Sequence, residues 1–208
     1  MHEVNGLRRA AMSPNRWAGV MMLQTAHRLN ERCISLLAET FRAGGARIGV
    51  SAMYGLRELW AQVDARACER AARCPVLLLD LNFQRNEWWR QVSQAHARAP
   101  SVTGTYALFT QEQATPLLRE ILTEAWSIGR SMPHVARLIF GMEPGVSSVI
   151  ADLCVPELDQ VAILYARYLR PRWEESRVFW QRLLLAAVGA DDEALAHAHL
   201  HCLQLLGS

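Results

Sequence analysis

Residues 13–45 read SPNRWAGVMMLQTAHRLNERCISLLAETFRAGG, and this stretch decides the fold class. Within it, a set of mostly apolar residues recurs at alternating steps of three and four, which is the spacing of one face of an α-helix. Ser13 before Pro14 has the form of an N-cap followed by proline at the first helical position, and Gly44–Gly45 ends the pattern. The seam consists of Met22, Ala26, Leu29, Cys33, Leu36 and Thr40. The sequence therefore predicts one long helix that packs along a partner helix through a narrow apolar seam.

Helical spacing continues along almost all of the remaining chain. Asp64 is the predicted N-cap of one helix, and Thr115–Pro116 repeats the Ser–Pro start signal. The expected helices cover residues 51–63, 65–74, 86–98, a segment starting at 115–116, 146–154, 156–169, 174–188 and 191–206. Two apolar stretches, 76–83 and 170–173, are too short for helices and are expected to be extended. The predicted fold class is all-α.

The two halves of the chain have similar patterns. In the first half, ARIGVS at 46–51 precedes a helix, LLLDLNF at 77–83 and EWWRQV at 87–92. In the second half, LIFGME at 138–143 precedes a helix, YLRPRW at 168–173 and VFWQRL at 178–183. This order predicts two tandem helical repeats, residues 1–100 and 101–208, the second with an extra C-terminal helix. A pseudo-twofold axis is expected to pair Gly49 with Gly141 and Phe83 with Trp173.

Composition excludes several classes of protein. Among the 208 residues, 51% are hydrophobic and 20% are charged, which excludes an intrinsically disordered chain. No apolar run approaches the roughly 20 residues of a membrane-spanning helix, and no secretory signal is recognisable. The five cysteines form no CxxC pair, and their odd number indicates buried thiols in a reducing compartment. We therefore expect a cytoplasmic globular protein without a membrane partner.

The second half resembles FlhD, the smaller subunit of the bacterial flagellar transcriptional activator. The resemblance covers about residues 117–184 and lies in LLREILTEAW (117–126), ARLIFGMEPGV (136–146), ADLCVPELDQVA (151–162) and YLRPRWEES (168–176). Arg172–Trp173 stands where the family has Arg–Phe, and Gly141 stands where it has its turn glycine. The family's cysteine before this stretch is replaced by Leu169, so the resemblance does not imply the family's intersubunit disulfide.

The resemblance implies a regulatory subunit. FlhD-like proteins act with a zinc-containing FlhC-like partner, bind promoter DNA as a mixed complex and recruit RNA polymerase. Related pairs control flagella or the transfer genes of mobile elements. A tandem chain could supply alone what two FlhD copies supply together, although fold analogy does not fix function.

Two groups of arginines are candidates for contact with DNA. Arg66, Arg70 and Arg73 share one face of a predicted helix. Arg167, Arg170 and Arg172 cluster at the matching place in the second half. Symmetry-related basic stripes could bind phosphates on neighbouring DNA segments. The alternative is a solvated face with glutamates as ion partners.

Aromatic and histidine residues provide the remaining candidates. Trp88 and Trp89 point about 100° apart on a helix, so both cannot easily be buried on one face; one is expected to contact the other half or a partner protein. Glu193, His197 and His201 share a face of the last helix, but they lack the ligand number of a zinc site. No phosphate loop, nucleophile elbow or paired-carboxylate cleft is recognisable. We therefore predict no enzyme activity, no metal, no cofactor and no small-molecule substrate.

A second function stays open. The seam helix, the aromatic pair and the net charge of +2 also suit a helical adaptor or chaperone of a bacterial secretion apparatus.

Overall fold

The computed structural model describes residues 14–43, 51–94 and 107–207. The fold of these residues is all-α, as predicted. Its elements in chain order are α1 (Pro14–Arg42), α2 (Ser51–Tyr54), α3 (Arg57–Ala61), α4 (Ala65–Ala72), β1 (Leu79–Asp80), α5 (Asn86–Gln94), α6 (Gln111–Ser131), α7 (Pro133–Phe140), α8 (Pro144–Asp152), α9 (Val155–Tyr165), the 3₁₀-helix η1 (Ala166–Tyr168), β2 (Arg170–Pro171), α10 (Arg177–Gly189) and α11 (Asp192–Leu206).

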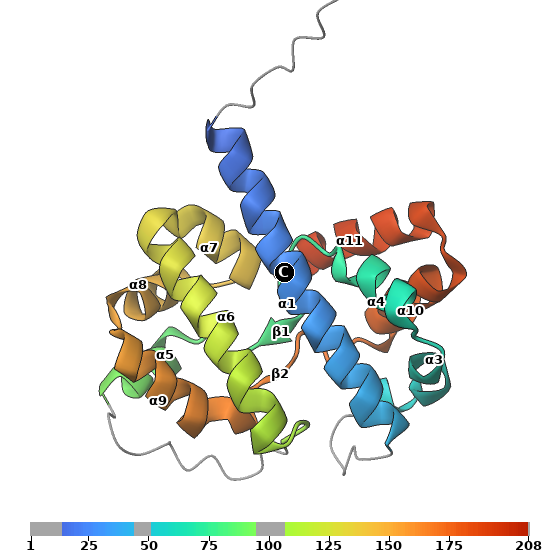
Figure 1. The fold of residues 1–208 in the computed structure, drawn as a ribbon, viewed down its shortest axis with the longest axis horizontal. Coiled ribbons are helices and arrows are strands. Elements are labelled where there is room, and N and C mark those ends of the chain that lie inside the picture. The colour runs from blue at the N-terminus through green and yellow to red at the C-terminus, as the bar shows by residue number, and fades with distance from the viewer. Residues whose placement is uncertain (1–13, 44–50, 95–106, 208) are drawn as a thin grey trace, which may run out of the picture.

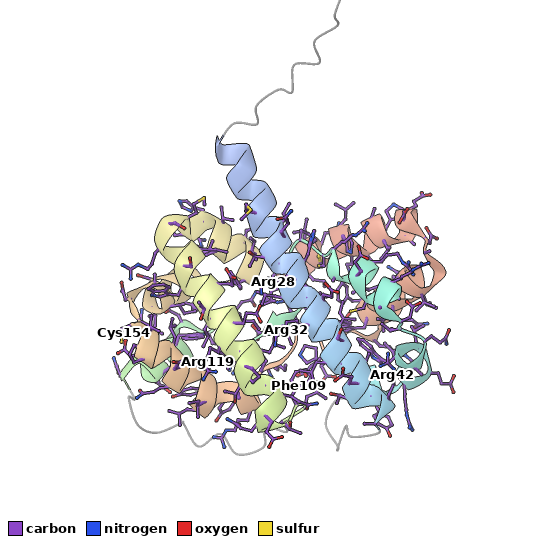
Figure 2. The ribbon with its side chains drawn as sticks, in the orientation of Figure 1. Arg28, Arg32, Arg42, Phe109, Arg119 and Cys154 are labelled. Carbon is purple, nitrogen blue, oxygen red and sulfur yellow. The ribbon has the colours of Figure 1, made fainter. Side chains whose placement is uncertain are left out.

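The long helices α1 and α6 lie next to each other in the middle of the molecule (Figure 1). Arg28 and Arg32 of α1 form ion pairs with Glu120 of α6, and Arg28 also pairs with Glu124 at 2.6 Å. Figure 2 shows both arginines on the stretch of α1 beside α6. The first turns of α1 extend beyond the other helices. The apolar seam of α1 predicts a partner helix along its whole length, but α6 lies beside only the later part of α1.

The other helices form two lobes around the two long ones, and each lobe contains helices from both halves of the chain. α5, from the first half of the chain, packs on α8 of the second half, whereas α10 packs on α3 and α4 of the first half. In Figure 1, α5 accordingly lies with α8 and α9, and α11 lies with α4 and α10. The buried apolar residues of both lobes form one continuous core. The predicted boundary between residues 100 and 101 lies outside the described residues.

Two short strands join the halves at the centre. β1 and β2 are antiparallel, with Leu79 opposite Pro171 and Asp80 opposite Arg170. Both extended stretches were expected from the sequence, because each is apolar and too short for a helix. The pairing between them satisfies backbone groups that would otherwise be buried without partners.

Asn30 is a buried polar residue in the middle of α1. Its side-chain amide donates to the carbonyl oxygens of Cys74 and Val76 at 3.1 and 2.9 Å and accepts a hydrogen bond from the backbone N–H of Leu78 at 2.8 Å. One side chain thus satisfies three backbone groups of the segment that leads from α4 into β1. Asn30 fixes the position of β1 against the seam of α1.

Three predicted helix boundaries are wrong. The helix expected over 51–63 is divided into α2 and α3 around Gly55–Leu56. The start expected at Thr115–Pro116 lies inside α6, because Thr110 and Gln113 form a capping box five residues earlier. The helix expected from Glu174 begins at Arg177, after a turn that places Trp173 at a φ of 53°. Local capping and turn chemistry overrode the apolar periodicity at each place.

Within the part of the chain described, no helix combines the length and the apolar character needed to cross a membrane.

Candidate nucleic-acid and partner surfaces

The arginines of α4 lie on one side of the helix, as its spacing predicts, but they are not equivalent. Arg66 and Arg73 are exposed, and Arg73 forms an ion pair with Glu69 one turn earlier at 3.0 Å. Arg70 is half-buried, and its Nε donates to the carbonyl oxygen of Ala187 in α10 at 2.7 Å. Arg70 therefore links α4 to α10, and Arg66 and Arg73 are the exposed arginines of this group.

The second arginine group does not form a stripe. Arg167 is exposed, and its guanidinium lies over the Tyr168 ring, 4.9 Å from the ring centroid. Arg170 is half-buried and lies 3.7 Å from the Glu174 carboxylate, and it donates to the Asn82 side chain at 3.1 Å. Its positive charge is thus largely matched within the chain.

Arg172 is 5% exposed, so its candidacy as a DNA contact is wrong. Its guanidinium donates to the carbonyl oxygens of Leu77 at 3.1 Å and Phe140 at 2.7 Å, and it lies 3.7 Å from Asp80. Burial lowers the pKa of this guanidinium, and the nearby Asp80 carboxylate opposes the shift. Arg172 acts as a structural cation that joins β1, β2 and the end of α7.

The two adjacent tryptophans are both used inside the chain. Trp89 is fully buried and stacks on Phe83, with ring centroids 5.9 Å apart. Trp88 is half-buried and packs edge-on against Tyr165 and Tyr168, at centroid distances of 5.2 and 5.9 Å. The prediction that one of the pair meets the other half of the chain is confirmed by Trp88. The assignment of Trp89 to a surface for a separate partner is wrong, because its side chain is fully buried. For the half-buried Trp88 that assignment stays a prediction.

The C-terminal histidines have different surroundings. His197 is exposed and His201 lies near the Phe179 ring. No group of three or more His, Cys, Asp or Glu side chains with metal-binding geometry exists among the residues that the structure describes. His199 is half-buried, near His27 of α1: burial lowers its pKa, and the charges of His27 and Arg73 lower it further.

Exposed apolar side chains include residues of α1 and α7. Met21 and Leu23, on the projecting part of α1, are 57% and 41% exposed. A groove of about 730 Å³ is lined by α7 and α11 and includes Leu138, Leu203 and Leu206. Leu138 is 60% exposed. These features indicate protein–protein contact more than the binding of a small ligand.

A second groove, of about 660 Å³, lies between α10 and α11. Leu185, Ala186 and Ala194 supply its apolar lining, and His197 and His201 lie along it. The grouping of these two histidines on one helix face was visible in the sequence. Their position on a groove depends on how α11 packs against α10.

The most informative residues were not all recognised from the sequence. The Nε1 of Trp89 donates to the carbonyl oxygen of Leu81 at 3.2 Å, and the Nε1 of Trp180 donates to that of Arg172 at 3.1 Å. In each case the bond spans eight residues. The signal available in the sequence was the repeated pair of an aromatic residue followed by Trp, Trp88–Trp89 and Phe179–Trp180. No family model, curated protein or solved structure matches this chain.

Proposed function

We propose that this chain is a regulatory subunit of the FlhD-like type, with two FlhD-like units fused in tandem, and that it binds promoter DNA together with an FlhC-like partner. The observation that carries the proposal is the correspondence between Trp89 and Trp180. Both side chains are fully buried, and each indole N–H donates to the carbonyl oxygen eight residues earlier. Each also follows an aromatic residue, Trp88 or Phe179, whose ring centroid is 5.4 Å from its own. The interplanar angles, 80° and 76°, are also alike.

Backbone geometry supports the same register. Asn82 and Trp173 share a φ of 53°, and the helices that follow begin at Asn86 and Arg177. All these pairs are 91 residues apart, and the antiparallel pairing of β1 with β2 is the one that a twofold axis between the strands would produce. In this proposed register Trp173 corresponds to Asn82, one residue before Phe83, its expected partner. Gly49, the expected partner of Gly141, lies outside the described residues.

The reduced set of available arginines supports a need for a partner. Of the six candidate DNA contacts, Arg70 and Arg170 are half-buried and Arg172 is buried, whereas Arg66, Arg73 and Arg167 are exposed. A net charge of +2 adds little long-range attraction to DNA. We expect the isolated chain to bind DNA weakly, with tight binding only in the mixed complex. RNA polymerase recruitment is proposed by analogy with the family.

The test is co-expression with an FlhC-like protein encoded near this gene, followed by titration of the complex with promoter DNA at several salt concentrations. Each phosphate contact contributes about 0.9 to the slope of log affinity against log salt. The double variant Arg66→Gln/Arg73→Gln is expected to reduce that slope by about two units. Arg85→Gln/Arg90→Gln on the α5 side removes the same charge and is the matched control.

An equal effect of both double variants would reject the α4 surface. Tight, sequence-specific binding by the isolated chain would reject the partner requirement. Failure to form a complex with the FlhC-like protein would reject the FlhD-like assignment itself.

A helical adaptor or chaperone of a secretion apparatus is the second candidate function. The exposed Met21 and Leu23 and the apolar groove between α7 and α11 favour it, because such surfaces bind other proteins. Two results would select this function over the first: stable binding to a secretion substrate, and no DNA binding in titrations at several salt concentrations.

A further inference from the structure

We propose that Cys74 and Cys202 form a reversible disulfide that fastens α11 to the first half of the chain. The two Sγ atoms are 3.0 Å apart, and both residues are fully buried. Cys74 follows α4, whereas Cys202 lies on α11, the last helix, 128 residues later. Since an S–S bond is about 2.05 Å long, the two atoms need to approach by only about 1 Å. This inference is independent of the proposed DNA-binding function.

The other cysteines differ from this pair in their surroundings. The Cys68 thiol contacts the Ser35 hydroxyl at 3.2 Å and donates to the Glu31 carbonyl at 3.3 Å. Cys154 is exposed, and its backbone N–H is held by the Glu157 carboxylate. Cys74 and Cys202 are the thiols that the fold brings into direct contact from distant parts of the chain.

The chemistry requires a two-electron oxidant, for which hydrogen peroxide is the simplest. One thiolate attacks the peroxide O–O bond, forming a sulfenic acid and, after proton transfer, water. The second thiol sulfur then attacks the sulfenic sulfur, the S–S bond forms, and a second water leaves. Two thiols and one peroxide thus give one disulfide and two waters.

Closure of α11 controls when this reaction can occur. The contact with Cys74 and burial raise the pKa of the Cys202 thiol, whereas the nearby Arg172 guanidinium lowers it. In the closed molecule the Cys202 thiol is therefore protonated, and both cysteines are shielded from solvent. Oxidation proceeds when the C-terminal helix opens, because opening exposes the thiols and allows thiolate to form. Reclosure then brings the sulfurs together.

The bond would fix one wall of the groove between α7 and α11. Leu203 and Leu206 follow Cys202 in sequence and line that groove together with Leu138. A cross-link at Cys202 prevents α11 from leaving α4, so it holds these leucines in place. The redox state of the pair thereby sets whether the groove can open.

The experiment treats the full chain carrying Cys154→Ser with hydrogen peroxide, blocks the remaining thiols with iodoacetamide and maps tryptic peptides. Cleavage after arginine separates peptide 74–85 from peptide 183–208, each with a single cysteine. We expect these two peptides joined, the intact mass lower by two hydrogens, and a Tm higher by about 10 °C that dithiothreitol reverses. The matched control, Cys202→Ala, is expected to show neither change.

Separate, alkylated peptides after oxidation of the folded chain would overturn the proposal. So would equal cross-linking of Cys74 to Cys33 or Cys68, or a cross-link without a rise in Tm. Cys74→Ala provides the same control if Cys202→Ala fails to fold, and the peptide map of the parent needs neither variant.

Discussion

The two candidate arginine groups were expected at matching places in the two halves of the chain, yet the group on α4 lies mainly on the surface and the group that follows α9 extends into the core. On α4, Arg66 and Arg73 are exposed. In the second half, Arg172 is 5% exposed and binds three backbone carbonyl oxygens. The difference comes from tertiary packing: Arg66 lies on the outer face of α4, whereas Arg172 directly follows β2 and is enclosed by β1 and the end of α7. Sequence clustering of charge therefore does not establish a charged surface.

The largest effect is expected for Arg172→Ala. The change leaves the carbonyl oxygens of Leu77 and Phe140 without their donor and removes the cation beside Asp80. We expect a loss of about 3–5 kcal/mol in the free energy of unfolding, measured by urea denaturation. Arg66→Ala, on the exposed face, is expected to change stability by less than about 0.5 kcal/mol. Similar values for the two variants would contradict the distinction between core and surface arginines.

Gly141→Ala tests the packing of the turn against Arg172. Gly141 has a φ of 55°, and an added Cβ would collide with the Arg172 guanidinium and with Leu206. Because this backbone region is unfavourable for alanine, we expect destabilisation by about 2–3 kcal/mol. Gly189→Ala is the control, since nothing lies within 4 Å of its added Cβ; there alanine is expected to stabilise α10 by up to about 1 kcal/mol. Equal effects in thermal unfolding would exclude the turn as the cause.

Trp89→Phe and Trp180→Phe test whether the two indole hydrogen bonds contribute equally to stability in the two halves. Each substitution keeps an aromatic ring and removes the indole N–H that binds the carbonyl oxygen eight residues earlier. We expect losses of about 1–2 kcal/mol for each variant, equal within about 0.5 kcal/mol as separate sites allow. The measurement is urea denaturation of both variants and their double. A loss at only one site would count against the tandem correspondence.

The smallest effect concerns two histidines, His199 of α11 and His27 of α1. Burial lowers the pKa of His27 and of His199 in the folded protein. The unfolded chain therefore binds more protons, so this contribution to stability is complete above about pH 6.5 and is lost as the pH falls through the folded pKa. We expect a modest fall in Tm below pH 6.5 that His199→Gln reduces. The exposed His197→Gln is the control and is expected to leave the profile unchanged.

Sequence reasoning predicted the features that depend on near neighbours. Asp64 caps α4 through the backbone N–H of Ala67 at 2.7 Å, and Gly141 ends α7 in the left-handed region, both as expected from local signals. The same reasoning misplaced the start of α6, because the capping box at Thr110 and Gln113 was not weighed against the Thr–Pro signal. Candidate site residues were predicted less well: Arg70, Arg172 and Trp88 contact segments far away along the chain.

The sequence by itself determined the all-α class, most helices and the two extended stretches, because apolar periodicity, caps and chain-breaking residues act over one or two turns. Tertiary structure alone decided that β1 pairs with β2, that α5 and α10 exchange lobes and that Arg172 is buried. It also decided that Cys74 meets Cys202. Contacts of this kind join residues tens of positions apart, and they form only when the packing of the whole core fixes where each element lies.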